Sequence, residues 1–322
     1  MVTHGSDQPF VVLFVVLHLI PGCALYASQA HHLAVGHGLN AAQLEYLPPD
    51  ASMPPTEVSD IEHRRISLPY AKTASEANKC VQDFAALRKT NITSGNRQRP
   101  FSTSNEDLEM LEILRRKAAQ GASPAALWSH GDAPRAFLEM GAFDGVTESN
   151  TIMYERCLNW TGVLIEPNPI AWHSLRHRSG RTHSHRIHAI PSCAAFTQLA
   201  MQKSRYTSAV VQPEHRTETT QVPCVPLTDI LTALGLSHLT FYSLDVESHE
   251  LMVLQTLDLS VVSVELLLVE SRNRDCQAVC PKRDAVRALL SSANYTRLPQ
   301  PVGQNDVYLS TFPTSKLTIP SR

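Results

Sequence analysis

The sequence predicts an α/β domain in which a mostly parallel sheet lies between two layers of helices. After Pro134, short apolar runs alternate with stretches of helical spacing. The run at 261–270 (VVSVELLLVE) is typical of a strand buried on both faces, as strands of parallel sheets are. Strand and helix in alternation indicate crossover connections. We therefore expect a single domain at 133–312, which is a sensible size for one core.

The individual elements follow from the same patterns. The expected strands are 137–140, 162–166, 185–190, 239–244, 261–270 and 305–310, and the expected helices lie near 147–158, 169–178, 227–235, 248–257 and 282–293. Upstream, 71–89 carries apolar residues at helical spacing. The stretch 104–107 resembles a capping box, and three basic residues at 115–117 precede Gly121. Both patterns predict helices.

Composition excludes several classes of protein. The chain has 322 residues, of which 43% are hydrophobic and 18% charged, so it can form a packed core. Its net charge of −2 lacks the basic excess of a nucleic-acid-binding protein, and we expect no nucleic acid as partner. Only one long apolar run exists, near the start, which excludes a protein with several membrane spans.

The N-terminal segment 1–27 has the features of a secretory signal. An apolar run at 10–20 is followed by Pro21-Gly22 and small residues, but no Lys or Arg precedes Arg64. A cleaved signal peptide and an uncleaved single N-terminal membrane anchor therefore remain open. Residues 28–100, rich in Pro, Ser and Thr, are expected to form a flexible linker or stem. Residues 101–132 would be a helical lead-in, and 313–322 a C-terminal tail.

Cysteines and sequons agree with entry into the secretory pathway. Seven cysteines are present, and removal of Cys23 with the signal leaves an even number, which suits disulfides in an oxidising lumen. The sequence does not fix their pairing, although a local Cys276–Cys280 bond is favoured. Sequons begin at Asn91, Asn159 and Asn294. We expect a glycoprotein of the ER or Golgi lumen, or a secreted one.

In a parallel sheet, ligands bind at the carboxyl ends of the strands. The first expected strand is followed by Glu139-Met140-Gly141-Ala142-Phe143-Asp144-Gly145, whose two glycines permit a tight turn and close approach to a ligand. The loop departs from the dinucleotide Gly-x-Gly-x-x-Gly pattern. One strand–helix–strand step later, Glu166 stands where an acid can bind ribose hydroxyls. The two motifs together predict a nucleoside-type cofactor.

A third group of polar residues, 245–250 (DVESHE), follows the fourth strand. Asp245, Glu247 or His249 could act as a general base, and the alternative is a set of acids that favours the dipole of the next helix. The acids would also suit a hard cation, but we expect no metal. The His-rich stretch 173–188 is expected to be a solvated face. No nucleophile elbow and no phosphate-binding P-loop is present in the sequence.

Four stretches together resemble the FkbM-type methyltransferase family: 137–151 (FLEMGAFDGVTESNT), 164–169 (LIEPNP), 226–231 (PLTDIL) and 242–259. Within it, the chain is most similar to the Star-like branch of animal lumenal or membrane-anchored proteins. The resemblance covers about 133–312. It implies a Rossmann-like, three-layer class I methyltransferase fold with a seven-stranded sheet whose last strand is antiparallel. It also implies S-adenosyl-L-methionine as cofactor.

The motifs and the resemblance together assign residues to roles. Asp245, Glu247 and His249 would be catalytic, and the cofactor would be bound by Glu139, Gly141, Ala142, Phe143, Asp144, Gly145, Asn150, Glu166, Pro167, Asn168 and Ser192. The implied activity is O-methylation of a hydroxyl on a glycan or a small molecule. Ser248 departs from the family, which has glycine there, and a side chain at that position would strain a left-handed backbone. A non-catalytic lumenal protein that binds a protein client in trafficking is therefore the alternative.

Overall fold

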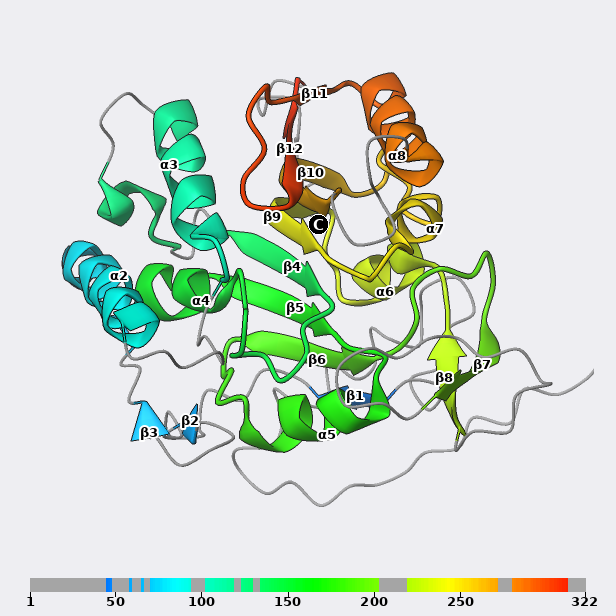
Figure 1. Ribbon diagram of the computed structural model, residues 1–322, viewed down its shortest axis with the longest axis horizontal. Coiled ribbons are helices and arrows are strands. Elements are labelled where there is room, and N and C mark those ends of the chain that lie inside the picture. Colours follow the sequence, from blue (N-terminus) through cyan, green and yellow to red (C-terminus); the bar gives the residue numbers. More distant parts are fainter. Residues whose placement is uncertain are drawn as a thin grey trace, which may run out of the picture.

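Figure 1 shows the computed structural model of the chain. The structure describes residues 45–47, 58–59, 65–66, 70–93, 102–118, 123–129, 134–202, 219–271 and 280–311. The expected signal or anchor segment, 1–27, and the expected tail, 313–322, lie outside these ranges. Among the described residues, no helix combines the length and the apolar character needed to cross a lipid bilayer.

One eight-stranded sheet forms the centre of the molecule, in the order β1-β6-β5-β4-β9-β10-β12-β11. Its strands are β1 (Glu45–Leu47), β4 (Ala136–Met140), β5 (Thr161–Ile165), β6 (Ser184–His188), β9 (His238–Leu244), β10 (Ser263–Glu270), β11 (Tyr295–Arg297) and β12 (Asn305–Ser310). Strands β6, β5, β4, β9 and β10 are parallel, and β12 is antiparallel to both of its neighbours. The predicted seven-stranded, mostly parallel fold is confirmed.

Two strands of this sheet were not expected from the sequence. The short strand β11 pairs with β12 and completes the seven, and β1 adds an antiparallel eighth strand beside β6. Each contains only three residues, which is too short for an alternating pattern to stand out from chance. Strand β1 comes from the segment that was expected to be a linker.

Helices cover both faces of the sheet (Figure 1). One face carries α2 (Ala77–Thr93), α3 (Glu106–Ala118), α4 (Ile152–Leu158) and α5 (Pro169–Arg178), and the other carries α6 (Leu227–Ala233), α7 (Glu250–Leu254) and α8 (Pro281–Ser292). All five residues of β4 are buried, because this central strand packs against both layers. The result is the three-layer arrangement that the sequence predicts.

Helix α2 packs against the domain, although it lies entirely in the segment 28–100 that was expected to be a linker. Val81 and Phe84 are buried in the same core as α4, and a disulfide joins Cys80 to Cys157 of α4. The helical spacing of these apolar residues predicted a helix over 71–89. Their spacing says nothing about which surface covers them, because that surface comes from a distant part of the chain.

A β-hairpin of β7 (Thr197–Gln202) and β8 (Thr219–Cys224) lies between β6 and α6, and it was not predicted. A second disulfide joins Cys193, before the hairpin, to Cys224 at its end. Cys280 is also disulfide-bonded, and its expected partner Cys276 lies outside the described residues. The remaining short elements are strands β2 (Val58–Ser59) and β3 (Arg65–Ile66) and the 3-10 turns η2 (Ala74–Glu76) and η3 (Pro124–Leu127).

Candidate active site at the strand ends

The loop after β4 and the loop after β9 touch at the carboxyl edge of the sheet. Gly141 has φ +75°, and a Cβ atom added to it would lie 1.9 Å from the backbone oxygen of Asp245. The Asp245 amide in turn donates a hydrogen bond to the Met140 carbonyl at 3.2 Å. Only glycine fits such an approach, so Gly141 joins the two predicted motifs into one site.

Glu139 is buried beneath this edge, with only 4% of its surface exposed. Its carboxylate accepts hydrogen bonds from Ser149 Oγ (2.8 Å), the Asn150 amide (2.6 Å) and Thr151 Oγ1 (2.6 Å). The resemblance implied that Glu139 binds the cofactor. In the structure, donors of the protein itself occupy its oxygens, and the residue fixes the start of α4.

Arg181 supports the same loop from below and is fully buried. It donates to the Gly145 carbonyl at 2.9 Å and to Thr151 Oγ1 at 2.9 Å, and its Nε lies 2.8 Å from the Glu155 carboxylate. Burial opposes the ionisation of Glu155, but Arg181 and the neighbouring hydroxyl donors lower its pKa to about 2. Sequence reasoning missed this pair, since an arginine in the turn between α5 and β6 carries no local signal.

Glu166 lies at the end of β5, as predicted, and holds two loops together. Its carboxylate oxygens accept the Phe143 amide and the Asn168 amide, each at 2.7 Å. Burial raises its pKa to about 7, against the two hydrogen bonds that lower it, and the nearby charge of Asp144 adds to the rise. The carboxyl group therefore changes its charge near neutral pH.

The two residues after Glu166 fix the loop that leads into α5. Asn168 caps α5 by accepting the Ile170 amide at 2.9 Å, and the Pro167 carbonyl lies 3.1 Å from His188 Nε2. The His188 ring stacks on Trp172, with 4° between the ring planes. His188 was not among the expected site residues, because its place at the end of β6 does not reveal its contact with the Pro167 loop.

The rest of the first loop is held by short-range bonds. Asp144 accepts the Val146 amide at 2.9 Å and the Thr147 amide at 2.7 Å, and the Gly145 amide donates to the Ala142 carbonyl at 2.7 Å. The side chain of Asp144 and all of Ala142 are buried. These residues give the loop its shape, while the exposed backbone of Gly141 and the half-buried Phe143 face the open side.

Asn150 links the first loop to β9. Its Nδ2 donates to Ser243 Oγ at 3.0 Å, and its Oδ1 is buried without a hydrogen-bond partner among the described residues. Together with its backbone bond to Glu139, this places Asn150 between β4 and β9 at the edge. An unused acceptor at this position is the kind of group that a ligand or a water satisfies.

Acidic residues converge where β9 and β10 end. Parallel pairing of Leu244 with Val269 places Asp245 beside Glu270, and their side chains are hydrogen-bonded. Asp245 keeps contact with solvent, although protein atoms crowd its carboxyl group. Lost hydration and the negative charge of Glu270 raise the pKa of Asp245, so this Asp245–Glu270 pair holds a proton more firmly than two separate acids would.

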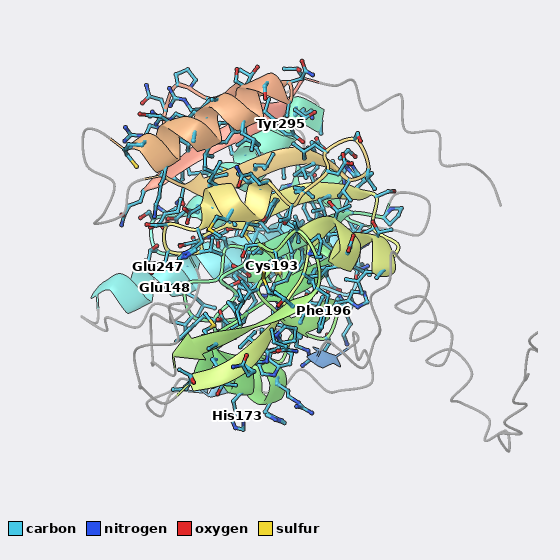
Figure 2. All side chains as sticks on the ribbon, turned by 90° about the vertical axis from the view of Figure 1, so that its right-hand side faces the viewer. Glu148, His173, Cys193, Phe196, Glu247 and Tyr295 are labelled. Carbon is cyan, nitrogen blue, oxygen red and sulfur yellow. A yellow bond between two sulfur atoms is a disulfide. The ribbon has the colours of Figure 1, made fainter. Side chains whose placement is uncertain are left out.

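The other expected catalytic residues occupy the loop after Asp245. Glu247 is exposed, and His249 is exposed with its Nδ1 3.2 Å from the Glu247 carbonyl (Glu247 is labelled in Figure 2). Glu250 accepts the Val246 and Ser248 amides, and burial raises its pKa. Sequence reasoning missed Glu270, although an acid at the end of a buried strand was the signal used for Glu139 and Glu166.

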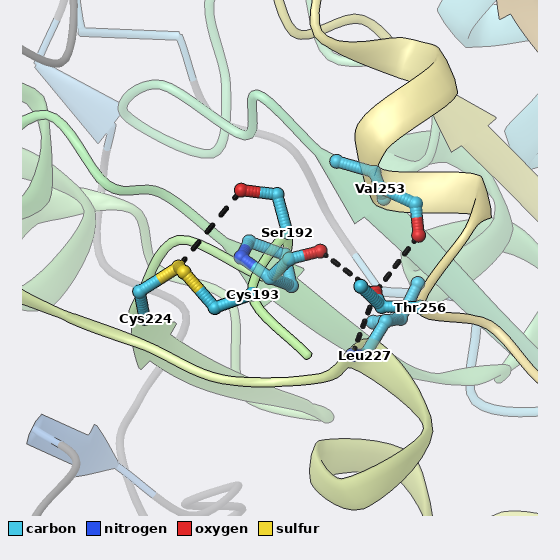
Figure 3. Close-up of a disulfide and its surroundings, with 7 residues drawn as sticks. Ser192, Cys193, Cys224, Leu227, Val253 and Thr256 are labelled. Atoms are coloured by element: carbon cyan, nitrogen blue, oxygen red, sulfur yellow. Dashed lines mark hydrogen bonds between the residues drawn. A yellow bond between two sulfur atoms is a disulfide. The ribbon is translucent and has the colours of Figure 1, made fainter. Parts of the chain in front are cut away.

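Ser192 lies in the loop after β6 and faces a separate cavity of about 620 Å³. None of the other cofactor-binding residues expected from the sequence lines this cavity, which is bounded by Ser192, Ala194, Pro226, Thr228, Asp229, Met252, Gln255, Thr256, Asp258 and Val261. Figure 3 shows Ser192 beside the Cys193–Cys224 disulfide, with Thr256 bonded to the backbone of the same loop. The strand ends hold the acids, so we place the chemistry there.

Strained backbone marks the same edge. Among the described residues, seven other than glycine have a positive φ, and three of them are asparagines, which tolerate this conformation. The other four are Phe143, Glu148, Glu247 and Ser248, and all lie in the loops after β4 and β9. Such strain persists where surrounding contacts enforce it, and it concentrates at functional sites.

No metal centre is evident in the part of the chain that the structure describes. No three His, Cys, Asp or Glu side chains there are arranged to hold an ion. His173 and His177 form a ring pair on the exposed side of α5, with centroids 4.8 Å apart. Both residues are exposed, but the solvated face expected over 173–188 is wrong for its second half, where Arg181, Arg186 and His188 are buried against the domain.

Comparisons with solved structures give low overall similarity to methyltransferases. An O-methyltransferase from Bacillus cereus in complex with SAH is 11% identical with a TM-score of 0.36. The match covers 79% of this chain and 95% of the Bacillus cereus chain. A putative caffeoyl-CoA O-methyltransferase from Staphylococcus aureus is 10% identical with a TM-score of 0.40, covering 72% and 99%. Methyltransferase FkbM from Methylobacillus flagellatus is 14% identical with a TM-score of 0.35, covering 73% and 60%.

The sequence comparison is more specific. No curated protein matches the chain. Residues 139–297 match the family model described as Methyltransferase FkbM domain. The matched region begins at Glu139 and includes Gly141, Glu166, Asp245 and Glu270. Residues 139–297 are therefore similar to the Methyltransferase FkbM domain.

Proposed function

We propose that the protein is an S-adenosylmethionine-dependent O-methyltransferase that acts on a hydroxyl of a glycan or a small molecule in the secretory pathway. The observation that carries the proposal is the joined edge of β4 and β9, where Gly141 approaches Asp245 and four residues adopt strained conformations. A plain strand-to-helix turn has no need of that strain. The similarity to the FkbM domain supports the reaction class, and the joined edge supports this location for the site.

The residues at this edge fit the cofactor in three respects. Gly141 exposes backbone without a side chain, Glu166 is an acid able to accept ribose hydroxyls, and Asn150 Oδ1 is an unused acceptor. Glu139 would act from beneath, by holding the start of α4. Bound S-adenosylmethionine supplies a methyl group on a positively charged sulfur, which an oxygen nucleophile can attack.

The Asp245–Glu270 pair is the best candidate for the general base. An acceptor hydroxyl must lose its proton as its oxygen attacks, and a carboxylate within hydrogen-bond reach can take it. The raised pKa of Asp245 makes it a stronger base than a free aspartate once it is ionised. The chain's other contribution is alignment, since a fixed loop orients the reacting groups before the displacement.

Disulfides support the secretory part of the proposal. Cys80–Cys157 and Cys193–Cys224 have bonding geometry, and Cys280 is bonded as well. Stable disulfides are typical of proteins that fold in an oxidising lumen. The segment 1–27 would deliver the chain there, as a cleaved signal or as a single-pass anchor with the domain in the lumen.

Ser248 favours a second candidate, a non-catalytic Star-like lumenal protein that binds a protein client. Ser248 has φ +73° at the position where the family has glycine, so the loop that carries Glu247 is strained. A loop adapted to another ligand would tolerate this substitution. The two candidates differ in whether the strand-end edge binds the cofactor.

Titration calorimetry with S-adenosylmethionine separates the candidates. We expect micromolar binding to the oxidised full-length protein, and Asp245→Asn should retain binding while losing methyl transfer to a hydroxyl acceptor. Glu270→Gln should retain transfer and move its pH dependence toward lower pH, because Asp245 then ionises beside a neutral amide. Absence of binding at millimolar cofactor would favour the client-binding candidate.

A further inference from the structure

The three sequons of the chain differ in how the structure presents them. The sequon of Asn91 lies in the last turn of α2. The sequons of Asn159 and Asn294 lie in turns that lead from a helix into a strand, from α4 into β5 and from α8 into β11. An N-linked glycan needs an asparagine side chain that projects from the surface of the folded protein.

Asn159 uses its side chain inside the fold. Its Nδ2, the atom that would carry a glycan, donates to the Ser129 carbonyl at 3.1 Å. Ser129 is buried, and the next residue, Trp160, is fully buried with its Nε1 bonded to the Leu127 carbonyl. A sugar on Asn159 would meet this packed segment between η3 and β5.

Asn294 presents the opposite arrangement. The residue is exposed, and its backbone is fixed by Thr311, whose amide and hydroxyl both donate to the Asn294 carbonyl. Tyr295, labelled in Figure 2, is buried, and its hydroxyl donates to the Val264 carbonyl at 2.8 Å. Among the described residues, no hydrogen bond reaches the Asn294 side chain, and Thr296 of the sequon is exposed.

We propose that Asn294 carries an N-linked glycan and that Asn159 remains unmodified. The modification transfers an oligosaccharide from a lipid-linked pyrophosphate donor. The sugar C1–oxygen bond breaks, a bond from C1 to Nδ2 forms, and the lipid pyrophosphate leaves while Nδ2 gives up a proton. The inference rests on the proposed secretory location.

The position of Asn294 is compatible with catalysis. Strand β11 runs parallel to β10, because both are antiparallel to β12. Asn294 precedes β11 and therefore lies at the edge where the parallel strands begin. Asp245 and Glu270 lie at the opposite edge, where β9 and β10 end. A glycan on Asn294 would leave the candidate active site open.

The test is a glycosidase mobility assay on the full chain made in a secretory host, in a Thr93→Ala background that removes the Asn91 sequon. Thr296→Ala removes the Asn294 sequon without altering the asparagine, and Thr296→Ser preserves it. Thr161→Ala removes the Asn159 sequon in the matched way. We expect a shift of one glycan that is lost in Thr296→Ala and retained in Thr296→Ser and Thr161→Ala.

Two results would overturn the inference: a shift that depends on Thr161, or no shift even when an established secretion signal is placed ahead of the full chain. A shift seen only with the added signal would support the Asn294 assignment and refute the proposed location. Cofactor binding, measured on the same proteins, should be equal with and without the glycan. If none of these proteins binds the cofactor, the result would count against the methyltransferase proposal and not against the glycan on Asn294.

Discussion

Both edges of the sheet contain turns with a left-handed backbone conformation, but different residue types adopt it at each edge. Where helices lead into strands, the left-handed positions are Asn159, Gly180, Gly235 and Asn294. Where strands lead into helices, they include Phe143, Glu148, Glu247 and Ser248 in addition to two glycines. Asparagine and glycine adopt this conformation at little cost, whereas the other four side chains oppose it.

This difference separates turns that only close a helix from turns that build a site. The Leu236 amide bonds to the Leu231 carbonyl around Gly235, which is the usual way a helix ends with glycine. At the other edge, Glu166 and Glu250 accept backbone amides of the strained loops. These side-chain contacts hold the loops in backbone conformations that their residues disfavour. The same edge carries the carboxyl groups with raised pKa.

The largest expected effect compares one glycine from each edge. Gly141→Ala should lower the free energy of unfolding by about 3 to 4 kcal/mol, because the added Cβ clashes with Asp245 in a left-handed conformation. Gly235→Ala has φ +72° but meets nothing within 4 Å, so it should cost only about 1 kcal/mol. Urea unfolding of the oxidised proteins measures both. Equal losses would mean that the approach of the two loops is not tight.

The second prediction concerns the charge at the strand-end edge. The pKa of Glu166 is raised from 4.5 to about 7, so the carboxylate that we propose to accept the ribose hydroxyls loses its charge as the pH falls through 7. The dissociation constant for S-adenosylmethionine should rise about tenfold between pH 8 and pH 6. Calorimetry at the two pH values measures this change, and Glu166→Gln should remove the dependence.

The raised pKa of Glu166 also affects the stability of the fold. A lower pH weakens cofactor binding but favours folding. Because the folded protein holds this proton more firmly than the unfolded chain, Glu166 favours folding below pH 4.5, and this contribution is lost as the pH rises to about 7. In protein without cofactor, the stability of Glu166→Gln relative to the unchanged protein should therefore be higher at pH 8 than at pH 5. A pH-independent difference would mean that the carboxyl is not perturbed.

The smallest expected effect tests the strain itself. Ser248→Gly should raise the free energy of unfolding by about 1 kcal/mol, because glycine adopts φ +73° without a steric penalty. Asn294→Gly, at φ +63°, should change it by less than about 0.5 kcal/mol, since asparagine already tolerates the conformation. Thermal unfolding of protein made without glycans measures both. A larger gain in the free energy of unfolding for Asn294→Gly than for Ser248→Gly would mean that the strain is not concentrated at the strand-end edge.

Much of the domain was predictable because its signals are local. The apolar runs predicted β4, β5, β6, β9, β10 and β12, and the residues after three of those runs predicted where the acids gather. The hairpin β7–β8 and the strands β1 and β11 were missed. Their pairing depends on partners distant in the chain, and their own patterns are weak or short.

The sequence by itself determined six strands of the sheet, the helices between them, and the positions of Gly141, Glu166 and Asp245 at strand ends, since periodicity and turn residues act over a few neighbours. Only the tertiary structure decided that Glu139 is enclosed by hydroxyl donors, that Glu270 pairs with Asp245 and that Cys80 bonds to Cys157. Each of these joins residues from separate elements. Which elements become neighbours depends on the sheet order, and that order is set by the packing of the whole core.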